Sequence, residues 1–329
     1  MAAYVVRRLG ALVMVLFFIL AVTFVIFFIF PVNPARDICG KGCTATTVAQ
    51  IDRQLGLSQP LWKQFLEYVG GIFAGRQFGQ GSHMLSCNVP CLGYSYQENL
   101  PVTTLLAQRL PVTVSIAVGA AVLWLIGGIT LGTVAALKKN TWVDRLVTTA
   151  SFAGLALPVF LVGIVLLLLF TSTWHLLPDP SYVSVFSNPA SFVVGLVQPW
   201  VALAVVYAAV YARFTRAKLI ETMSQQFITT ARAKGLPERR VVVHHGLRAA
   251  ITPVITIFGM DFGSLLGGAV IVETVYGLPG IGQLLIQAVN TTDIPVVTGV
   301  TLLAAFFVVF ANLLVDLVYA ALDPRVRLG

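Results

Sequence analysis

Long apolar runs separated by short polar stretches dominate this chain. The first run, residues 9–30, carries no charge. At about 1.5 Å per residue, a helix of this length crosses a hydrocarbon core of about 30 Å. Further apolar runs lie at about 104–137, 146–170, 199–214, 251–272 and 294–321. The pattern therefore predicts an all-α integral membrane protein with six transmembrane helices.

The first apolar run has two possible interpretations, because Arg7 and Arg8 precede it as basic residues precede the core of a signal peptide. The run is longer than the roughly 7–15 apolar residues of such a core. Residues 31–34, PVNP, also do not resemble a small-residue cleavage site. We therefore expect residues 1–30 to form an N-terminal segment that keeps its membrane helix.

Residues 31–101 are expected to form a long extracytoplasmic loop. Thr44 can cap a short helix that ends at Gly56. Residues 61–73 have a broad apolar face, which is typical of a helix lying along the membrane surface. Residues 75–99 are rich in Gly, Ser, Asn and Tyr and are expected to be irregular. The rest of the chain, 102–329, is expected to be a five-helix membrane core.

Composition supports a membrane protein in contact with lipid. Only 10% of the residues are charged and 57% are hydrophobic, whereas soluble domains have about 25% charged residues. We attribute the net charge of +8 to basic cytoplasmic loops of a cell-membrane protein and not to nucleic-acid binding. With both termini in the cytoplasm, the basic residues expected inside are Arg7, Arg8, Lys138, Lys139, Arg145, Arg213, Arg216, Lys218, Arg232, Lys234, Arg239, Arg240, Arg248, Arg325 and Arg327.

The most highly charged stretch, residues 226–254, lies between the expected fourth and fifth spans. Apolar positions interrupted by Gly235-Leu236-Pro237 predict a short helix, a turn and a second helix. The small residues Thr229, Thr230, Ala231 and Ala233 leave room for another protein to approach closely. A solvated basic loop explains the charge alone, whereas the ordered pattern favours a docking element.

Motifs of enzyme chemistry are not found in the sequence. No GxxxxGK[ST] loop, HExxH or GxSxG pattern occurs. The adjacent His244 and His245 diverge by about 100° on a helix, so they do not chelate a metal as an i, i+4 pair does. We therefore expect no catalytic residue, no bound metal and no cofactor in this chain.

Ionisable residues within membrane spans are costly and usually face the interior of the bundle. Asp261 lies near the middle of the expected fifth span, where it either lines a translocation path and meets an amino terminus or bonds internally to another span. Asp316 is assigned a structural role. Gly263, Gly267 and Gly268 allow close helix packing, either between two subunits or within one. Pro158 is expected to kink the third span.

Four cysteines lie in the expected outer loop, as the pairs Cys39/Cys43 and Cys87/Cys91. An even count on the oxidising side favours two disulfides over a metal site or free thiols. Bonds between the pairs would join distant parts of the loop, and we favour this connectivity over bonds within each pair. The resulting segment is expected to touch a partner or the transported substrate.

Several separated blocks resemble the membrane permease subunits of dipeptide/oligopeptide ABC importers. The blocks are LGLSQPLWKQF at 55–65, RLPVTVSIAVGA at 109–120, ARAKGL at 231–236, FGSLLGGAVIVETVYGLPGIG at 262–282 and NLLVDLVYAALDPR at 312–325, together with His245, Leu247, Arg248, Ala250 and Pro253. They occur in the family's order and cover nearly the whole chain.

This resemblance implies a type I ABC importer permease with a cytoplasmic coupling loop at 219–250. It assigns contact with an ATPase to Thr229, Thr230, Ala231, Arg232, Ala233, Lys234, Gly235, Leu236 and Glu238. The family's usual glutamate is absent at 229. Glu273, Gly277 and Pro279 are implied to form an outer element near a gate, and Asp261 and Pro158 are assigned to the translocation path.

The resemblance also implies partners: a second homologous permease, two ATPase subunits that carry ATP and Mg, and an extracytoplasmic substrate-binding protein that delivers peptides. The same machinery with another cargo (nickel, glutathione, haem or oligosaccharide) is one alternative. A stand-alone secondary transporter is another, although no internal repeat of the expected kind is seen.

Overall fold

The computed structural model describes residues 2–29, 44, 46, 59–78, 85–95 and 97–322. Its membrane helices are α1 (Ala2–Ile29), α5 (Val102–Leu137), α6 (Trp142–Ala156), α7 (Val159–Leu166), α8 (Pro189–Met223), α11 (Arg248–Leu266) and α14 (Ile294–Leu322). In the part described, α5, α8, Glu238–Leu266 and α14 are each long and apolar enough to span a membrane. The expected all-α membrane fold is confirmed.

The third expected span is broken and not merely kinked. Helix α6 ends at Ala156, and α7 continues through the π-helical segment η1 (Leu167–Thr173). The two halves meet at 98°. Pro158 precedes α7 in an extended conformation, which a proline ring accepts but a continuing helix does not. The residue before it, Leu157, is also extended, as expected before proline.

The fifth span begins and ends earlier in the chain than predicted, and the fourth is longer. Helix α11 ends at Leu266, and Gly268 follows with φ of 131°, a conformation that favours glycine. The chain then forms two short helices, α12 (Val270–Val275) and α13 (Ile281–Asn290), so Glu273 lies in α12 and not at the end of a span. Helix α8 extends the predicted fourth span at both ends, from Pro189 to Met223, and its added last turns include the buried Leu219.

Close packing of α5 against α8 forms the centre of the molecule. Glycines make this approach possible: a Cβ at Gly132 would lie 2.5 Å from the Ala212 carbonyl oxygen, and one at Gly128 would lie 2.5 Å from the Tyr211 Cβ. Helix α14 packs on α11 in the same way, where Gly263 lies beside Ala311 and Gly267 beside Ala304. The glycines of α11 therefore serve packing within this chain.

The outer segment contains more regular structure than predicted. Helix α4 (Leu61–Ala74) confirms the helix at 61–73, and its Phe65 ring packs on Phe17 and Phe24 of α1. Two antiparallel pairs follow where an irregular loop was expected: β1 (Arg76–Phe78) with β2 (Leu85–Cys87), and β3 (Tyr94–Ser95) with β4 (Leu100–Pro101). The predicted helix at 44–56 lies outside the described residues, except for Thr44 and Thr46.

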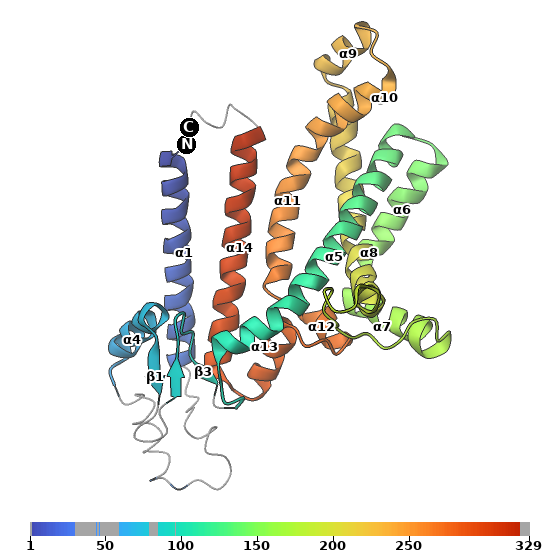
Figure 1. The fold of residues 1–329 in the computed structure, drawn as a ribbon. Coiled ribbons are helices and arrows are strands. Elements are labelled where there is room, and N and C mark those ends of the chain that lie inside the picture. Colours follow the sequence, from blue (N-terminus) through green and yellow to red (C-terminus); the bar gives the residue numbers. More distant parts are fainter. Residues whose placement is uncertain are drawn as a thin grey trace.

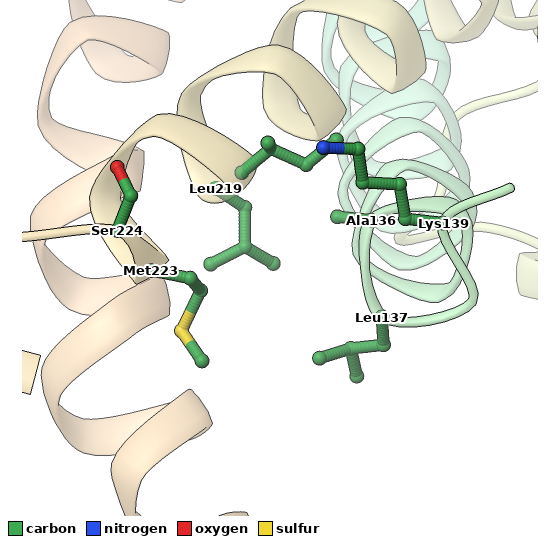
Figure 2. A pocket seen from close by; sticks show the side chains of 7 residues that line it. Ala136, Leu137, Lys139, Leu219, Met223 and Ser224 are labelled. Atoms are coloured by element: carbon green, nitrogen blue, oxygen red, sulfur yellow. The ribbon is translucent and has the colours of Figure 1, made fainter. Parts of the chain in front are cut away.

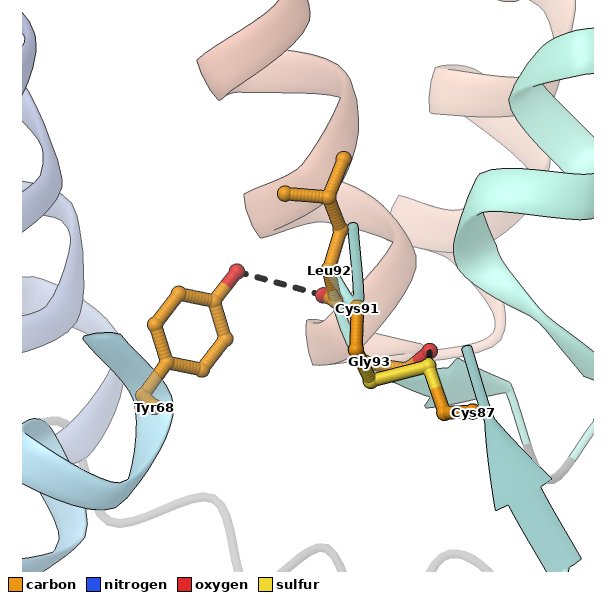
Figure 3. The surroundings of a disulfide bond; sticks show 5 residues. All are labelled: Tyr68, Cys87, Cys91, Leu92 and Gly93. Atoms are coloured by element: carbon orange, nitrogen blue, oxygen red, sulfur yellow. Dashed lines mark hydrogen bonds between the residues drawn. A yellow bond between two sulfur atoms is a disulfide. The ribbon is translucent and has the colours of Figure 1, made fainter. Parts of the chain in front are cut away.

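One disulfide joins Cys87 to Cys91, so the expectation of bonds between the two cysteine pairs is wrong (Figure 3). The chain reverses between these cysteines and brings their Cα atoms to 5.5 Å, a normal disulfide distance. Both cysteines are buried, and the Tyr68 hydroxyl donates a hydrogen bond of 3.1 Å to the nearby Leu92 carbonyl. Cys39 and Cys43 lie outside the described residues.

Candidate functional site

A compact helical module projects from one end of the bundle. It comprises α9 (Gln226–Ala233), α10 (Glu238–Arg240) and the π-helical segment η2 (Val241–Leu247). Figure 1 shows α9 and α10 beyond the ends of α8 and α11, at the same end as the start of α1 and the end of α14. This helix–turn–helix arrangement was predicted for residues 226–254, and we call residues 226–247 the coupling module.

A small apolar core holds the coupling module together. Ile228, Ala231 and Val241 are buried in it, and Met223 and Leu236 pack around them. These residues come from α8, α9, the turn and η2, so the core ties the module to the end of a membrane helix. Ala231 and Leu236, two of the predicted coupling residues, therefore act inside the module and not on its surface.

The turn of the module is closed by glycine and by an ion pair. Gly235 has φ of 75°, and its N–H donates to the Arg232 carbonyl at 2.9 Å. Arg232 donates two hydrogen bonds to the Glu238 carboxylate, at 2.6 and 3.1 Å. This pairing raises the pKa of Arg232 and lowers the pKa of Glu238. Bidentate geometry fixes direction as well as distance, so the pair sets the angle between α9 and α10.

The exposed face of the coupling module is small, basic and partly apolar. Phe227 and Val243 remain 47% and 49% exposed although both are large and apolar. The other exposed residues of the module include Thr229, Thr230, Ala233, Lys234, Arg239, Arg240 and His244. Large apolar side chains exposed among polar and basic residues are typical of a protein-binding surface.

A cavity of 270 Å³ lies beside the coupling module, between the ends of α5 and α8 (Figure 2). Leu137 and Leu219 line its apolar side, and Lys139 and Ser224 bring polar groups to it. Met223 lines this cavity and also packs in the core of the module. The sequence pattern did not predict the cavity, because it depends on where two helices end relative to each other.

Close to this end of the bundle, a buried carboxylate joins α6 to α8. Arg216 donates to both oxygens of Asp144, at 2.5 and 2.8 Å. The Asn140 N–H donates to the same carboxylate at 3.0 Å. The sequence analysis placed Arg216 only as a basic residue on the inner side and did not predict this pair, whose members are far apart in the chain.

At the opposite end, Glu273 is fully buried among three helices. Its carboxylate accepts hydrogen bonds from the Thr113 hydroxyl of α5 at 2.7 Å and from the Gln283 N–H of α13 at 3.0 Å. Thr113 in turn accepts one from the Ile281 N–H at 2.9 Å. The carboxylate thus lies at the N-terminus of α13, where unpaired N–H groups favour negative charge.

The other predicted gate and path residues found at this end are exposed. Gly277 adopts φ of 63° in the turn after α12, and both it and Pro279 are exposed. Pro158 is also exposed, at the bend before α7. The Tyr276 hydroxyl donates to the Gly163 carbonyl at 3.2 Å, which brings α12 against α7. The structure thus collects these elements at one end, although only Glu273 is enclosed.

Asp261 lies on α11 at a half-buried position and accepts a hydrogen bond of 2.8 Å from the Tyr211 hydroxyl of α8. The internal bond weighed from the sequence is therefore present. The side chain of Asp316 lies outside the described residues. Among the described residues, no group of three or more His, Cys, Asp or Glu could hold a metal ion.

Comparison with known proteins covers almost the whole chain. Residues 128–328 match the family model of the binding-protein-dependent transport system inner membrane component, and residues 1–117 match the model of the N-terminal part of such components.

Three relatives show the extent of the similarity. The probable peptide ABC transporter permease protein y4tP of Sinorhizobium fredii is 34% identical over 99% of this chain and 100% of its own length. A putative peptide transport system permease protein of Brucella abortus and the glutathione transport system permease protein GsiC of Escherichia coli are each 35% identical, over 99% of both chains. The chain therefore belongs to the family of binding-protein-dependent transport system inner membrane components.

Proposed function

We propose that this chain is the permease subunit of an ATP-driven importer that carries di- and oligopeptides across the cell membrane. The observation that carries the proposal is the coupling module: a folded, basic surface that projects from a bundle of membrane helices. The names of the relatives, peptide permeases and a permease for the small peptide glutathione, support peptides as cargo.

The coupling module is the surface on which an ATPase subunit would dock. Thr229, Thr230, Ala233 and Lys234 would face that subunit, with Phe227 and Val243 as apolar anchors. The Arg232–Glu238 pair and Gly235 would keep the module rigid, so that movement of the ATPase reaches α8 and α11. ATP and Mg would bind in the ATPase subunits, and this chain would contribute no catalytic residue or cofactor.

The assembly would contain a second homologous permease, two ATPase subunits and an extracytoplasmic substrate-binding protein. The start of α1 and the end of α14 lie at the same end of the bundle as the coupling module, which supports a cytoplasmic location of both termini (Figure 1). The segment 31–101 and the elements around Glu273, Gly277 and Pro279 would then face outward, where the binding protein delivers peptide. Pro158 and Asp261 would border the path between these two ends.

The proposal is tested by uptake and by copurification together. Cells lacking this chain should lose uptake of labelled di-, tri- or longer peptides, and the chain should copurify with ATPase subunits. A triple alanine variant at Arg232, Lys234 and Glu238 should assemble but transport poorly. Normal peptide uptake in the absence of the chain would refute the peptide function. Normal uptake by the triple variant would refute the role of the module.

A further inference from the structure

Helix α11 has two packed faces and one open face. Gly259 and Gly263 pack on α14, and Val254 and Leu265 are buried on the opposite side, in the core formed with α5 and α8. Met260, 46% exposed, and Ser264 lie between these faces and remain open. At 100° per residue, Asp261 falls at the border between the open face and the face toward α8.

A connected group of aromatic rings adjoins this carboxylate through Tyr211. Tyr211 bonds to it, and the fully buried Trp124 ring stacks on Tyr207 with centroids 4.8 Å apart. Phe258 packs 6.1 Å from Trp124 and 5.4 Å from Phe262. The Trp124 indole N–H is buried without an acceptor in hydrogen-bond geometry in the part of the chain that is described.

A carboxylate in mid-span is costly when it faces lipid, so the open face of α11 is better suited to a polar path than to the bilayer. Tyr211 donates to one carboxylate oxygen, Oδ2, and is the only donor to this carboxylate among the described residues. Aromatic faces attract cations, more strongly where water is excluded. A carboxylate joined to a cluster of rings, of which Tyr207, Phe258 and Phe262 are only partly buried, is therefore suited to an ammonium group attached to an apolar frame.

We propose that Asp261, with Tyr211 bonded to it and the connected rings of Trp124, Tyr207, Phe258 and Phe262 next to Tyr211, forms a subsite for the α-ammonium group of a peptide passing through the bundle. This inference rests on the proposed function. The subsite lies on α11, directly continuous with the coupling module, so it would be formed or opened as that helix moves.

The test uses the complete importer reconstituted with its binding protein. Two peptides that load the binding protein equally are compared, one with a free α-ammonium group and one N-acetylated. Asp261→Asn should reduce transport of the free peptide roughly tenfold and leave the acetylated one within about twofold. Asp261→Glu should restore much of the preference for the peptide with the free α-ammonium group. Ser264→Ala, on the open face of the same helix, is the matched control and should transport both peptides normally.

Each outcome separates the subsite from the proposed function. Transport of neither peptide by the unaltered importer would refute the peptide function. An unchanged ratio between the two peptides in Asp261→Asn would overturn the subsite. If Asp261→Asn reduced transport of an N-acetylated peptide with an internal lysine as much as it reduced transport of the free peptide, the assignment of the subsite to the α-ammonium group would be overturned. If Asp261→Asn does not assemble, Tyr207→Leu should lower the same ratio, and an unchanged ratio there would also overturn the subsite.

Discussion

Single residues in this protein act mainly by fixing the relative positions of neighbouring elements. Glu238 closes the coupling module against Arg232, and Glu273 joins the helices α5, α12 and α13. Asp293 precedes α14 and accepts hydrogen bonds from the Ser95 hydroxyl and the Val296 N–H. Each carboxylate therefore links segments that are distant in the sequence or that meet at a turn.

The Arg232–Glu238 pair predicts a specific pattern of rescue. Glu238→Ala should lower peptide uptake severalfold because the angle between α9 and α10 is no longer fixed. Exchanging the two charges, Arg232→Glu with Glu238→Arg, should recover a large part of the uptake. Arg239→Ala, which removes an exposed charge that takes no part in the pair, is the control. An exchanged variant as inactive as Glu238→Ala would contradict the positioning role.

Burial of Asp293 predicts a pH-dependent stability. Burial raises the pKa of this carboxyl, although the Ser95 hydroxyl bond acts in the opposite direction. A carboxyl whose pKa is raised in the folded state binds more protons there than when unfolded, so its contribution is lost as pH rises through the folded pKa. Between about pH 4 and pH 7, the thermal unfolding midpoint of the unaltered protein in detergent should therefore fall relative to that of Asp293→Asn. Parallel profiles of the two proteins would contradict this.

At the scale of elements, glycines decide how closely the membrane helices pack. The pattern of the sequence located the spans well because lipid requires continuous apolar helices. It predicted a kink at Pro158 but not a bend of 98°, and it did not locate the end of α11 at Leu266, since both depend on what packs against the exposed backbone. The short strands of the outer segment were missed for a similar reason: each has only two or three residues.

Two glycines of α5, Gly127 and Gly132, should respond differently to substitution by alanine. Gly132→Ala would place a methyl group 2.5 Å from the Ala212 backbone oxygen, which cannot move without moving α8. We expect it to destabilise the protein by about 1–3 kcal/mol, as overpacking does. Gly127→Ala would meet only the Ala208 Cβ at 3.7 Å and should be tolerated. The thermal unfolding midpoints of the two variants are to be compared in detergent, and equal midpoints would contradict the packing argument.

At the scale of the whole molecule, the sequence predicted the presence and position of the coupling module better than its internal contacts. Residues 226–254 were recognisable because a folded, basic pattern interrupts an apolar chain. The partners of the key carboxylates were not, because Thr113 lies 160 residues from Glu273 and Tyr211 lies 50 residues from Asp261. No pattern within one helix reveals such pairs. The predicted cysteine connectivity was wrong for a similar reason, since the spacing of the cysteines in the sequence does not determine which of them pair.

The orientation of the whole chain can be tested with two introduced cysteines. Lys138→Cys, exposed at the end of α5 beside the coupling module, should react with a membrane-impermeant maleimide only after cells are made permeable. Phe186→Cys replaces a side chain that is 96% exposed in the loop before α8, and it should react in intact cells. Labelling of the unmodified chain serves as the background. The reverse pattern would invert the proposed topology.

The continuity of Glu238–Leu266 has an energetic consequence. This helical stretch has 29 residues and extends from the coupling module to Asp261 and beyond, a length of about 40 Å. If ATP on one side and peptide on the other each favour one position of this helix, their binding free energies are linked. Linkage is reciprocal, so a peptide that strengthens ATP binding tenfold must itself bind tenfold more tightly when ATP is present.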